Sequence, residues 1–149
     1  MTGSRNSGVE PALARIMPAE AAILIQHDAD VLAARKAART LAVRLGFSST
    51  DLALIATAIS EIARNILTYA KRGEMTFEAV QEPARRGIVV VAKDSGPGIP
   101  DIAQAMQDGY STGNGLGLGL PGARRLMDEF TIESKAGHGT TIVMKKWTP

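Results

Sequence analysis

The stretch GYSTGNGLGLGLPG, residues Gly109–Gly122, decides how the fold of this sequence is interpreted. Glycine occupies every second position from Gly113 to Gly119. Glycine is less favourable than alanine inside helices and strands by about 0.5–1 kcal/mol, so this run is either a flexible connector or a loop with accessible N–H groups. The interleaved leucines and the helix-like sequence that follows argue against a polar linker. We therefore predict a loop that leads into a helix N-terminus, where anions bind.

The composition excludes several classes of protein. With 149 residues, of which 45% are hydrophobic, the chain is expected to form one globular domain. It contains no apolar run near the roughly 18 residues of a membrane span and no signal-peptide pattern, so we expect a cytoplasmic protein without a membrane partner. The absence of cysteine and the wide separation of His27 and His138 argue against disulfides and a zinc site. A net charge of +2 and an aromatic content of 4% argue against nucleic-acid binding.

Hydrophobic periodicity predicts one domain over residues 19–149, preceded by a disordered tail over residues 1–18. Strands are expected at residues 21–26, 75–79, 88–92, 130–134 and 140–147, and helices at residues 28–45, 48 to about 73, 102–107 and 116–130. Asp28 or Asp30 is the expected cap of the first helix, and Ser48 caps the second. The run IVVVA at residues 88–92 predicts a central strand that is buried on both faces.

The second predicted helix carries Glu61 and Asn65 within the sequence SEIARNILTYA, residues 60–70. These two residues are four apart, so they share the helical face that points away from the apolar stripe. They are either a solvated polar pair or a functional pair. In a functional pair, the carboxylate would act as a general base and the amide oxygen as a ligand for Mg²⁺.

Asp94 follows the most buried predicted strand, in the sequence DSGPGIP. Aspartate, glycine and proline are common in turns, so a simple turn is one interpretation. The alternative is a recognition site in which the carboxylate binds an amine on a flat ring, and Gly96 and Gly98 let the backbone approach that ring closely.

The glycine-rich stretch also matches motifs that the surrounding sequence does not support. Gly117, Gly119 and Gly122 have the spacing of a dinucleotide fingerprint, but no strand precedes them and no acidic residue follows at the required distance. Ser111 lies in a Gly-x-Ser-x-Gly pattern, and Asp128 and His138 follow in the order found in hydrolases. The residues before Ser111 do not form a buried strand, so a hydrolase remains a remote alternative.

Read together, these stretches resemble the GHKL ATP-binding superfamily. Its N box, G1 box, G2 box and terminal Gly-Thr motif appear here in that order, as Glu61-x-x-x-Asn65, Asp94-x-Gly96-x-Gly98, Gly115-x-Gly117-x-Gly119 and Gly139-Thr140-Thr141. The four motifs span about two thirds of the chain. Within the superfamily the sequence is similar to small serine/threonine kinases that act on STAS-domain antagonists in bacterial stress signalling. The resemblance implies a two-layer α+β sandwich with a mixed, mostly antiparallel sheet and helices on one face.

The resemblance also implies a role for each matching position, with ATP and Mg²⁺ as cofactors. Glu61 would polarise the acceptor hydroxyl, Asn65 would hold Mg²⁺, and Asp94 would accept a hydrogen bond from the adenine amino group, with Thr141 near the same ring. Gly96 and Gly98 would admit the nucleotide. A mobile lid would contact the phosphates through residues Gly113, Gly115, Leu116, Gly117, Leu118 and Gly119.

The implied function is phosphorylation of a serine or threonine on a STAS-domain partner, followed by binding of a PP2C-type phosphatase. An anti-sigma factor that binds a sigma subunit directly is the alternative within the same fold, and a nucleotide-gated adaptor without catalysis is a second alternative. The related anti-sigma kinases commonly carry histidine where this chain has Tyr69, which favours the phosphatase-activating type. For Arg64 three roles stay open: contact with the phosphates, contact with a partner, or simple solvation.

Overall fold

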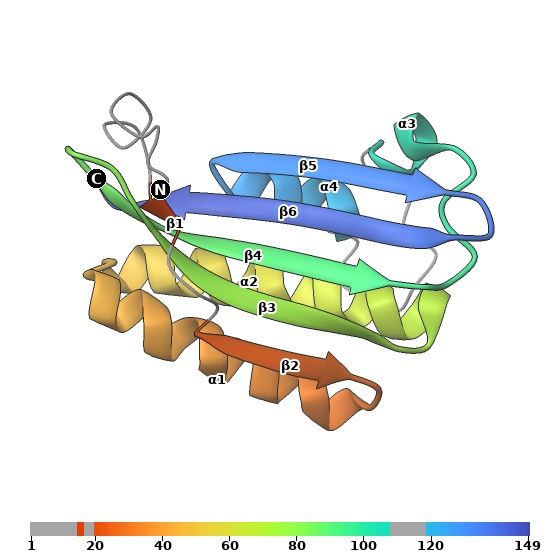
Figure 1. Cartoon of the computed structure of the whole chain (residues 1–149), viewed down its shortest axis with the longest axis horizontal. Coiled ribbons are helices and arrows are strands. Elements are labelled where there is room, and N and C mark those ends of the chain that lie inside the picture. Colours follow the sequence, from red (N-terminus) through yellow and green to blue (C-terminus); the bar gives the residue numbers. More distant parts are fainter. Residues whose placement is uncertain (1–14, 17–19, 108–118) are drawn as a thin grey trace, which may run out of the picture.

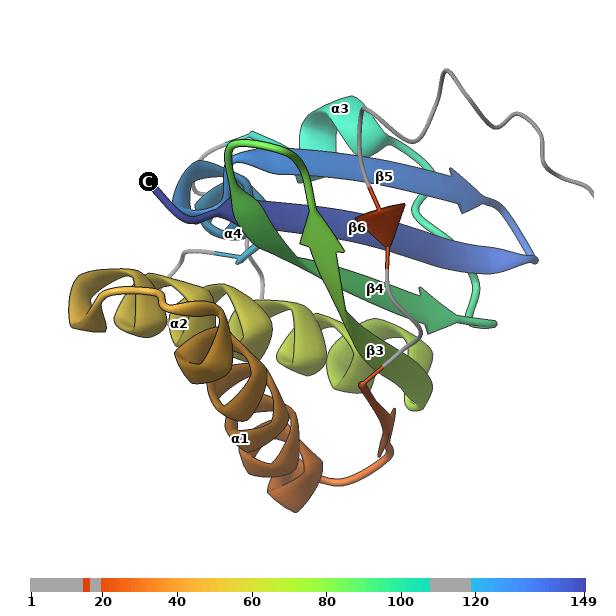
Figure 2. The ribbon, with the colours of Figure 1, turned by 60° about the vertical axis from the view of Figure 1, so that its left-hand side comes forward.

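The computed structural model describes residues 15–16, 20–107 and 119–149. In this part of the chain, strands form one six-stranded sheet. The helices α1 (Asp28–Leu45), α2 (Ser49–Asn65) and α4 (Gly119–Leu126) contribute to the same hydrophobic core on one face of that sheet (Figure 1). A rotated view shows α1 and α2 as a layer beneath the sheet (Figure 2). The predicted two-layer α+β sandwich is therefore confirmed.

The sheet brings together strands from both ends of the sequence. They are β1 (Arg15–Ile16), β2 (Ala21–Ile25), β3 (Gly73–Gln81), β4 (Arg86–Asp94), β5 (Glu129–Lys135) and β6 (Gly139–Trp147). Their order is β1-β3-β4-β6-β5, and β2 also pairs with β3. Every pairing among the described residues is antiparallel, so the parallel component expected of a mixed sheet is not found there. β1 lies within the segment expected to be a tail, and the rest of that segment is outside the described residues.

The central strand β4 is buried on both faces, as predicted. Ile88, Val90 and Ala92 point into the main core, which the helices cover. On the opposite face, Val89 packs in a smaller cluster with Val80 and Trp147. The Arg85 guanidinium lies 3.6 Å from the centre of the Trp147 ring, and this cation–π contact covers the cluster. The hydrophobic run IVVVA thus fills two separate layers.

Helix α1 has the predicted bounds, but His27 rather than Asp28 or Asp30 occupies the N-cap position. Asp30, the third residue of the helix, still stabilises the helix start by binding the residues that precede it. Its carboxylate accepts hydrogen bonds of 2.9 Å from the N–H groups of Gln26 and His27. These two bonds lower the pKa of Asp30 below its usual value of 3.8. The carboxylate therefore fixes the turn between β2 and α1.

Helix α2 is capped as predicted, since the Ser48 hydroxyl accepts a hydrogen bond from the N–H of Asp51 at 3.2 Å. The expected continuous helix to about residue 73 is interrupted. After Asn65 the chain continues as a π-helical turn, η3 (Ile66–Ala70). Residues Ser49–Ala70 are long and apolar enough to cross a membrane by length and composition alone. Their buried side chains, including Ile59 and Ile62, belong to the core, which identifies a core helix.

The C-terminal third contains a shorter helix than predicted, followed by the predicted hairpin. Helix α4 ends at Leu126 rather than at residue 130. The chain turns there because the Asp128 carboxylate accepts a hydrogen bond from the N–H of Trp147 at 2.8 Å. Strands β5 and β6 then form the hairpin, each within one residue of its predicted start. The short helix α3 (Ile102–Ala105) lies in the connection between β4 and α4.

Candidate functional site

A pocket of about 230 Å³ lies beyond the ends of β4 and β5, since Gly98, which lines it, lies against Lys135 at the end of β5. Both strands finish at the same end of the sheet (Figure 1). Four segments form its wall: the end of α2 with η3, the loop after β4, α3, and the start of α4. The lining residues are Asn65, Tyr69, Pro97, Gly98, Ile99, Pro100, Ala105, Gly119, Leu120 and Pro121. Residues from three of the predicted motifs therefore share one cavity.

Glu61, which belongs to α2, lies beside this pocket and next to the start of α4. Its Oε1 atom accepts a hydrogen bond from the N–H of Gly119 at 3.1 Å. The side chain is only 10% exposed, and the Arg64 guanidinium lies 3.9 Å from the other carboxylate oxygen, Oε2. The face of α2 that was expected to point outward is thus covered by α4. A carboxylate occupies the helix N-terminus, where a negative charge is stabilised.

Asn65 is one turn further along and lines the pocket itself. Among the described residues, no group of three or more His, Cys, Asp or Glu side chains could hold a metal ion. Mg²⁺ in nucleotide sites commonly takes only one or two protein oxygens, with phosphates and waters completing the shell. The amide oxygen of Asn65, close to Glu61 in the helix, fits that chemistry.

Asp94 ends β4, and its carboxylate folds back to accept a hydrogen bond from the N–H of Gly96 at 2.9 Å. At Gly96 an added Cβ would lie 2.6 Å from the Cβ of Ala70, so the loop after β4 rests directly on η3. Gly98 has φ +81, and a Cβ there would lie 2.5 Å from the carbonyl oxygen of Lys135. Both glycines are therefore required by close approach of the loop to the protein's own η3 and β5. Their predicted approach to the ring of a ligand stays a prediction.

The structure separates the two adjacent threonines of the Gly-Thr-Thr motif. Thr140 is the register partner of Asp94, whereas Thr141 pairs with Lys93. Successive residues of a strand point to opposite faces. Thr140 is 6% exposed and shares the helix-covered face with Ile142, so Thr141 points to the other face, away from Asp94. Thr140, which the sequence interpretation passed over, is the threonine placed beside Asp94.

The remaining predicted residues divide into two groups. Gly119 begins α4 at the pocket wall, while Gly113, Gly115, Leu116, Gly117 and Leu118 lie outside the described residues.

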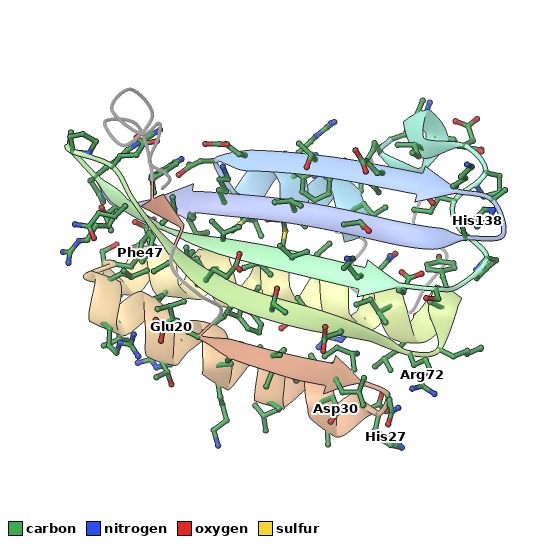
Figure 3. The ribbon with its side chains drawn as sticks, viewed as in Figure 1. Glu20, His27, Asp30, Phe47, Arg72 and His138 are labelled. Atoms are coloured by element: carbon green, nitrogen blue, oxygen red, sulfur yellow. The ribbon has the colours of Figure 1, made fainter. Side chains whose placement is uncertain are left out.

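The residues of the hydrolase alternative do not come together. Ser111 lies outside the described residues. Asp128 precedes β5 and His138 lies in the turn that follows it (Figure 3), so a seven-residue strand of roughly 23 Å separates them. These two side chains cannot belong to one catalytic triad, and the hydrolase alternative is wrong.

Comparisons with known proteins agree with this geometry. Residues 26–146 match the family model described as histidine kinase-like ATPase domain. The chain is 49% identical over 128 residues to serine/threonine-protein kinase RsbT of Bacillus subtilis (strain 168), covering 86% of this chain and 96% of that protein. It is 30% identical to anti-sigma F factor of Clostridium novyi (strain NT) and 32% identical to that of Thermoanaerobacter sp. (strain X514), covering in each case 76% of this chain and 82% of the relative. The resemblance inferred from the four motifs is confirmed.

Proposed function

Because the chain belongs to the histidine kinase-like ATPase domain family, we propose that it is an ATP- and Mg²⁺-dependent serine/threonine kinase that phosphorylates a protein partner. The observation that carries this proposal is the convergence of Glu61, Asn65 and the first N–H of α4 at one pocket. A base, a metal ligand and an anion-binding helix terminus are the groups that phosphoryl transfer needs. That reaction depends mainly on positioning and on stabilisation of charge.

Each predicted site residue in the described part of the chain has a role in the proposed reaction. Asp94 accepts a hydrogen bond from the amino group of the adenine, and Thr140 replaces Thr141 as the neighbouring contact. Gly96 and Gly98 keep the loop after β4 close to the base. Bound ATP would supply the phosphoryl group, and Mg²⁺ would supply the positive charge that neutralises the phosphates, with Asn65 as the protein ligand of the metal. Glu61 accepts the proton of the acceptor hydroxyl.

The glycine-rich stretch completes the nucleotide site in this proposal. Gly119 donates its N–H to Glu61 in the present structure, and the same group is available to a phosphate oxygen when the carboxylate turns toward the acceptor. Residues Gly113, Gly115, Leu116, Gly117 and Leu118 precede α4 and would surround the phosphates as a lid.

We assign the acceptor to a STAS-domain protein and expect the released kinase to activate a PP2C-type phosphatase, in the cytoplasm. The similarity to RsbT over most of both chains supports this branch. The similarity to anti-sigma F factors supports the second candidate, direct binding of a sigma factor. Tyr69, in the position where related anti-sigma kinases commonly have histidine, lines the pocket and favours the first candidate.

The variant Glu61→Gln tests the kinase assignment. Glutamine keeps a carbonyl oxygen that can accept the hydrogen bond from Gly119, but it cannot take a proton, so the fold and the nucleotide site are preserved. Since a general base typically contributes a factor of about 100 to 10,000, we expect transfer of labelled phosphate from ATP to a STAS-domain protein to fall at least about 100-fold. ATP affinity, measured by calorimetry, should be retained.

Arg64→Gln is the matched comparison, because Arg64 is 55% exposed and only loosely paired with Glu61. It should keep most of the transfer activity. Undiminished transfer by Glu61→Gln would refute the base assignment. If wild-type protein binds ATP yet transfers phosphate to no STAS-domain protein, the non-catalytic adaptor is the correct function. Recovery of a purified sigma factor by the wild-type chain would instead support the anti-sigma candidate.

A further inference from the structure

Lys146, near the end of β6, holds the C-terminal end of α4. Its Nζ atom donates a hydrogen bond of 3.0 Å to the carbonyl oxygen of Leu126, the last residue of α4. The last four carbonyl groups of a helix have no partner within the helix, so this ammonium supplies one from outside. A positive charge at this end is also favoured by the helix dipole. Lys146 is therefore an anchor for α4 that the sheet provides.

The anchor extends over three consecutive residues of β6. The Asp128 Oδ1 atom lies 3.6 Å from the Lys146 ammonium, and the Oδ2 atom accepts a hydrogen bond from the N–H of Trp147 at 2.8 Å. The N–H of Asp128 donates to the carbonyl oxygen of Lys145 at 2.9 Å. Strand β6 lies between β4 and β5 and pairs with both, so the anchor belongs to a well-braced part of the sheet.

Opposite charges therefore lie at the two ends of α4, and both are buried. The side chains of Glu61, beside the N-terminus, and Lys146, beside the C-terminus, are each 10% exposed. Removing a charge from water is costly, and an apolar side chain of similar volume often serves stability equally well. The buried ammonium is thus explained better by the position that it imposes on α4 than by the stability that it adds.

The lateral and axial positions of α4 have different causes. Leu120 and Ala123 lie in the main core, where they hold the helix against α2. Apolar contacts have no direction, so they limit sliding of the helix along its axis only weakly. The hydrogen bond to Leu126 is directional and fixes the axial position. Because α4 has eight residues, a length of about 12 Å, a shift at its C-terminus is carried to Gly119 at the pocket.

We infer that Lys146 is a positioning residue of the phosphate site: it fixes α4 along its axis, so that the first N–H groups of the helix lie where the phosphates of ATP bind. This inference rests on the proposed ATP-binding function. Lys146 lies at the opposite end of α4 from the pocket, so it acts through the helix and not on the ligand. The proposed adenine contacts come from Asp94 and the loop after β4. A change at Lys146 should therefore affect binding of the phosphates and not of the base.

The test compares ATP with AMP, which has the same base but lacks the outer phosphates. With Mg²⁺ present and well below the melting temperature, calorimetry gives the dissociation constant of ATP, and displacement of ATP gives that of AMP. Lys146→Met keeps the length of the side chain but loses its charge and its protons. In this variant the preference for ATP over AMP should fall by about fivefold to tenfold, the size of one hydrogen bond between α4 and a phosphate. The loss should come from weaker ATP binding, with AMP binding unchanged.

Lys145→Met is the matched control. Lys145 is the neighbouring lysine of β6, its ammonium lies 3.7 Å from the Glu129 carboxylate, and it points to the opposite face of the sheet. This variant should keep the wild-type preference for ATP. Lys146→Arg retains a cation that can donate to the carbonyl oxygen of Leu126 and should restore most of the preference. A preference as low as that of Lys146→Met would contradict the role of this hydrogen bond.

A purely structural role for Lys146 would give a different result. In that case Lys146→Met would lower the melting temperature and weaken the binding of ATP and AMP equally, and the inference would be wrong. If the methionine variant does not fold, Lys146→Gln, whose neutral side chain is one atom shorter, must show the same selective loss. Failure of the wild-type chain to bind ATP would overturn the proposed function itself. ATP binding with an unchanged preference in Lys146→Met would overturn only this inference, whereas the transfer test on Glu61 stands independently.

Discussion

At the scale of single residues, Gly139 carries the strictest geometric requirement of the site. It has φ +104, and an added Cβ would collide with the carbonyl oxygen of Asp94. Gly139→Ala should therefore combine the cost of an unfavourable backbone conformation with a displacement of Asp94. We expect a loss of at least about 2 kcal/mol in the free energy of unfolding, measured by urea denaturation, together with weaker ATP binding.

Gly137 in the same turn provides the comparison for Gly139. Its φ is +77, but nothing lies within 4 Å of an added Cβ. Gly137→Ala should consequently cost only the backbone term, about 1 kcal/mol. If the two variants are equally stable and bind ATP equally well, the close contact with Asp94 has no energetic importance.

The two threonines after Gly139 show what a motif alone leaves undecided. The resemblance placed Thr141 near the base, whereas the structure places Thr140 beside Asp94. The alternation of β6 decides it, because Ile142 and Met144 lie in the core and Thr140 has the same parity. That signal is present in the sequence, provided that the strand is read from its apolar residues. The hydrogen bond that the Ser134 hydroxyl accepts from the N–H of Ile99 leaves no such signal in the sequence, since it depends on how β5 and the loop after β4 meet.

At the scale of elements, the start of α1 gives a prediction that depends on pH. The pKa of Asp30 is lowered by the N–H groups of Gln26 and His27, so the folded state holds the charged form more strongly than the unfolded state does. A group whose pKa is lower in the folded state stabilises the protein above its unfolded pKa, and this contribution disappears as the pH falls through the folded pKa.

We therefore expect Asp30→Asn to be less stable than the wild type at pH 7, with the difference shrinking below about pH 4. Urea denaturation at several pH values measures it. Asp28→Asn removes the same charge from the same helical turn. Among the described residues the Asp28 carboxylate accepts no hydrogen bond from a backbone N–H group, so this variant should show a smaller and flatter effect. A difference for Asp30→Asn that is constant from pH 7 to pH 3 would contradict the proposed role of its carboxylate.

The limits of sequence-based prediction also appear at this scale. Element types were predictable from period and caps, as Ser48 and the alternation of β6 show. Ends that depend on tertiary contacts were not. The apolar pattern of α2 continues past Asn65, yet the helix widens into η3 where Gly96 packs on Ala70. Helix α4 stops early because Asp128 bonds the last residue of β6, far away in the sequence.

At the scale of the whole molecule, the motifs that are spread from residue 61 to residue 140 meet at one end of the sheet. The order of the motifs could be predicted from the sequence because it follows the family pattern. The coupling of Glu61 to the start of α4 could not, since it requires α2 and α4 to lie side by side on the sheet. The pocket joins four separate segments, so a ligand bound there should stabilise the entire domain.

This coupling leads to a prediction for thermal unfolding. A ligand that binds only the folded state at 100 times its dissociation constant adds about 2.7 kcal/mol of stability, which corresponds to a rise in melting temperature of roughly 5–11 °C for a domain of this size. We expect that rise in melting temperature with MgATP, measured by calorimetry or intrinsic fluorescence.

The contribution of the metal is tested separately. Chelation of Mg²⁺ should remove a large part of the rise, and in Asn65→Ala the rise caused by ATP should be the same with and without Mg²⁺. Asp94→Asn should show almost no rise at the same concentration. An equal rise with and without Mg²⁺ in the wild type would argue against Asn65 as a metal ligand, while leaving the adenine contact intact.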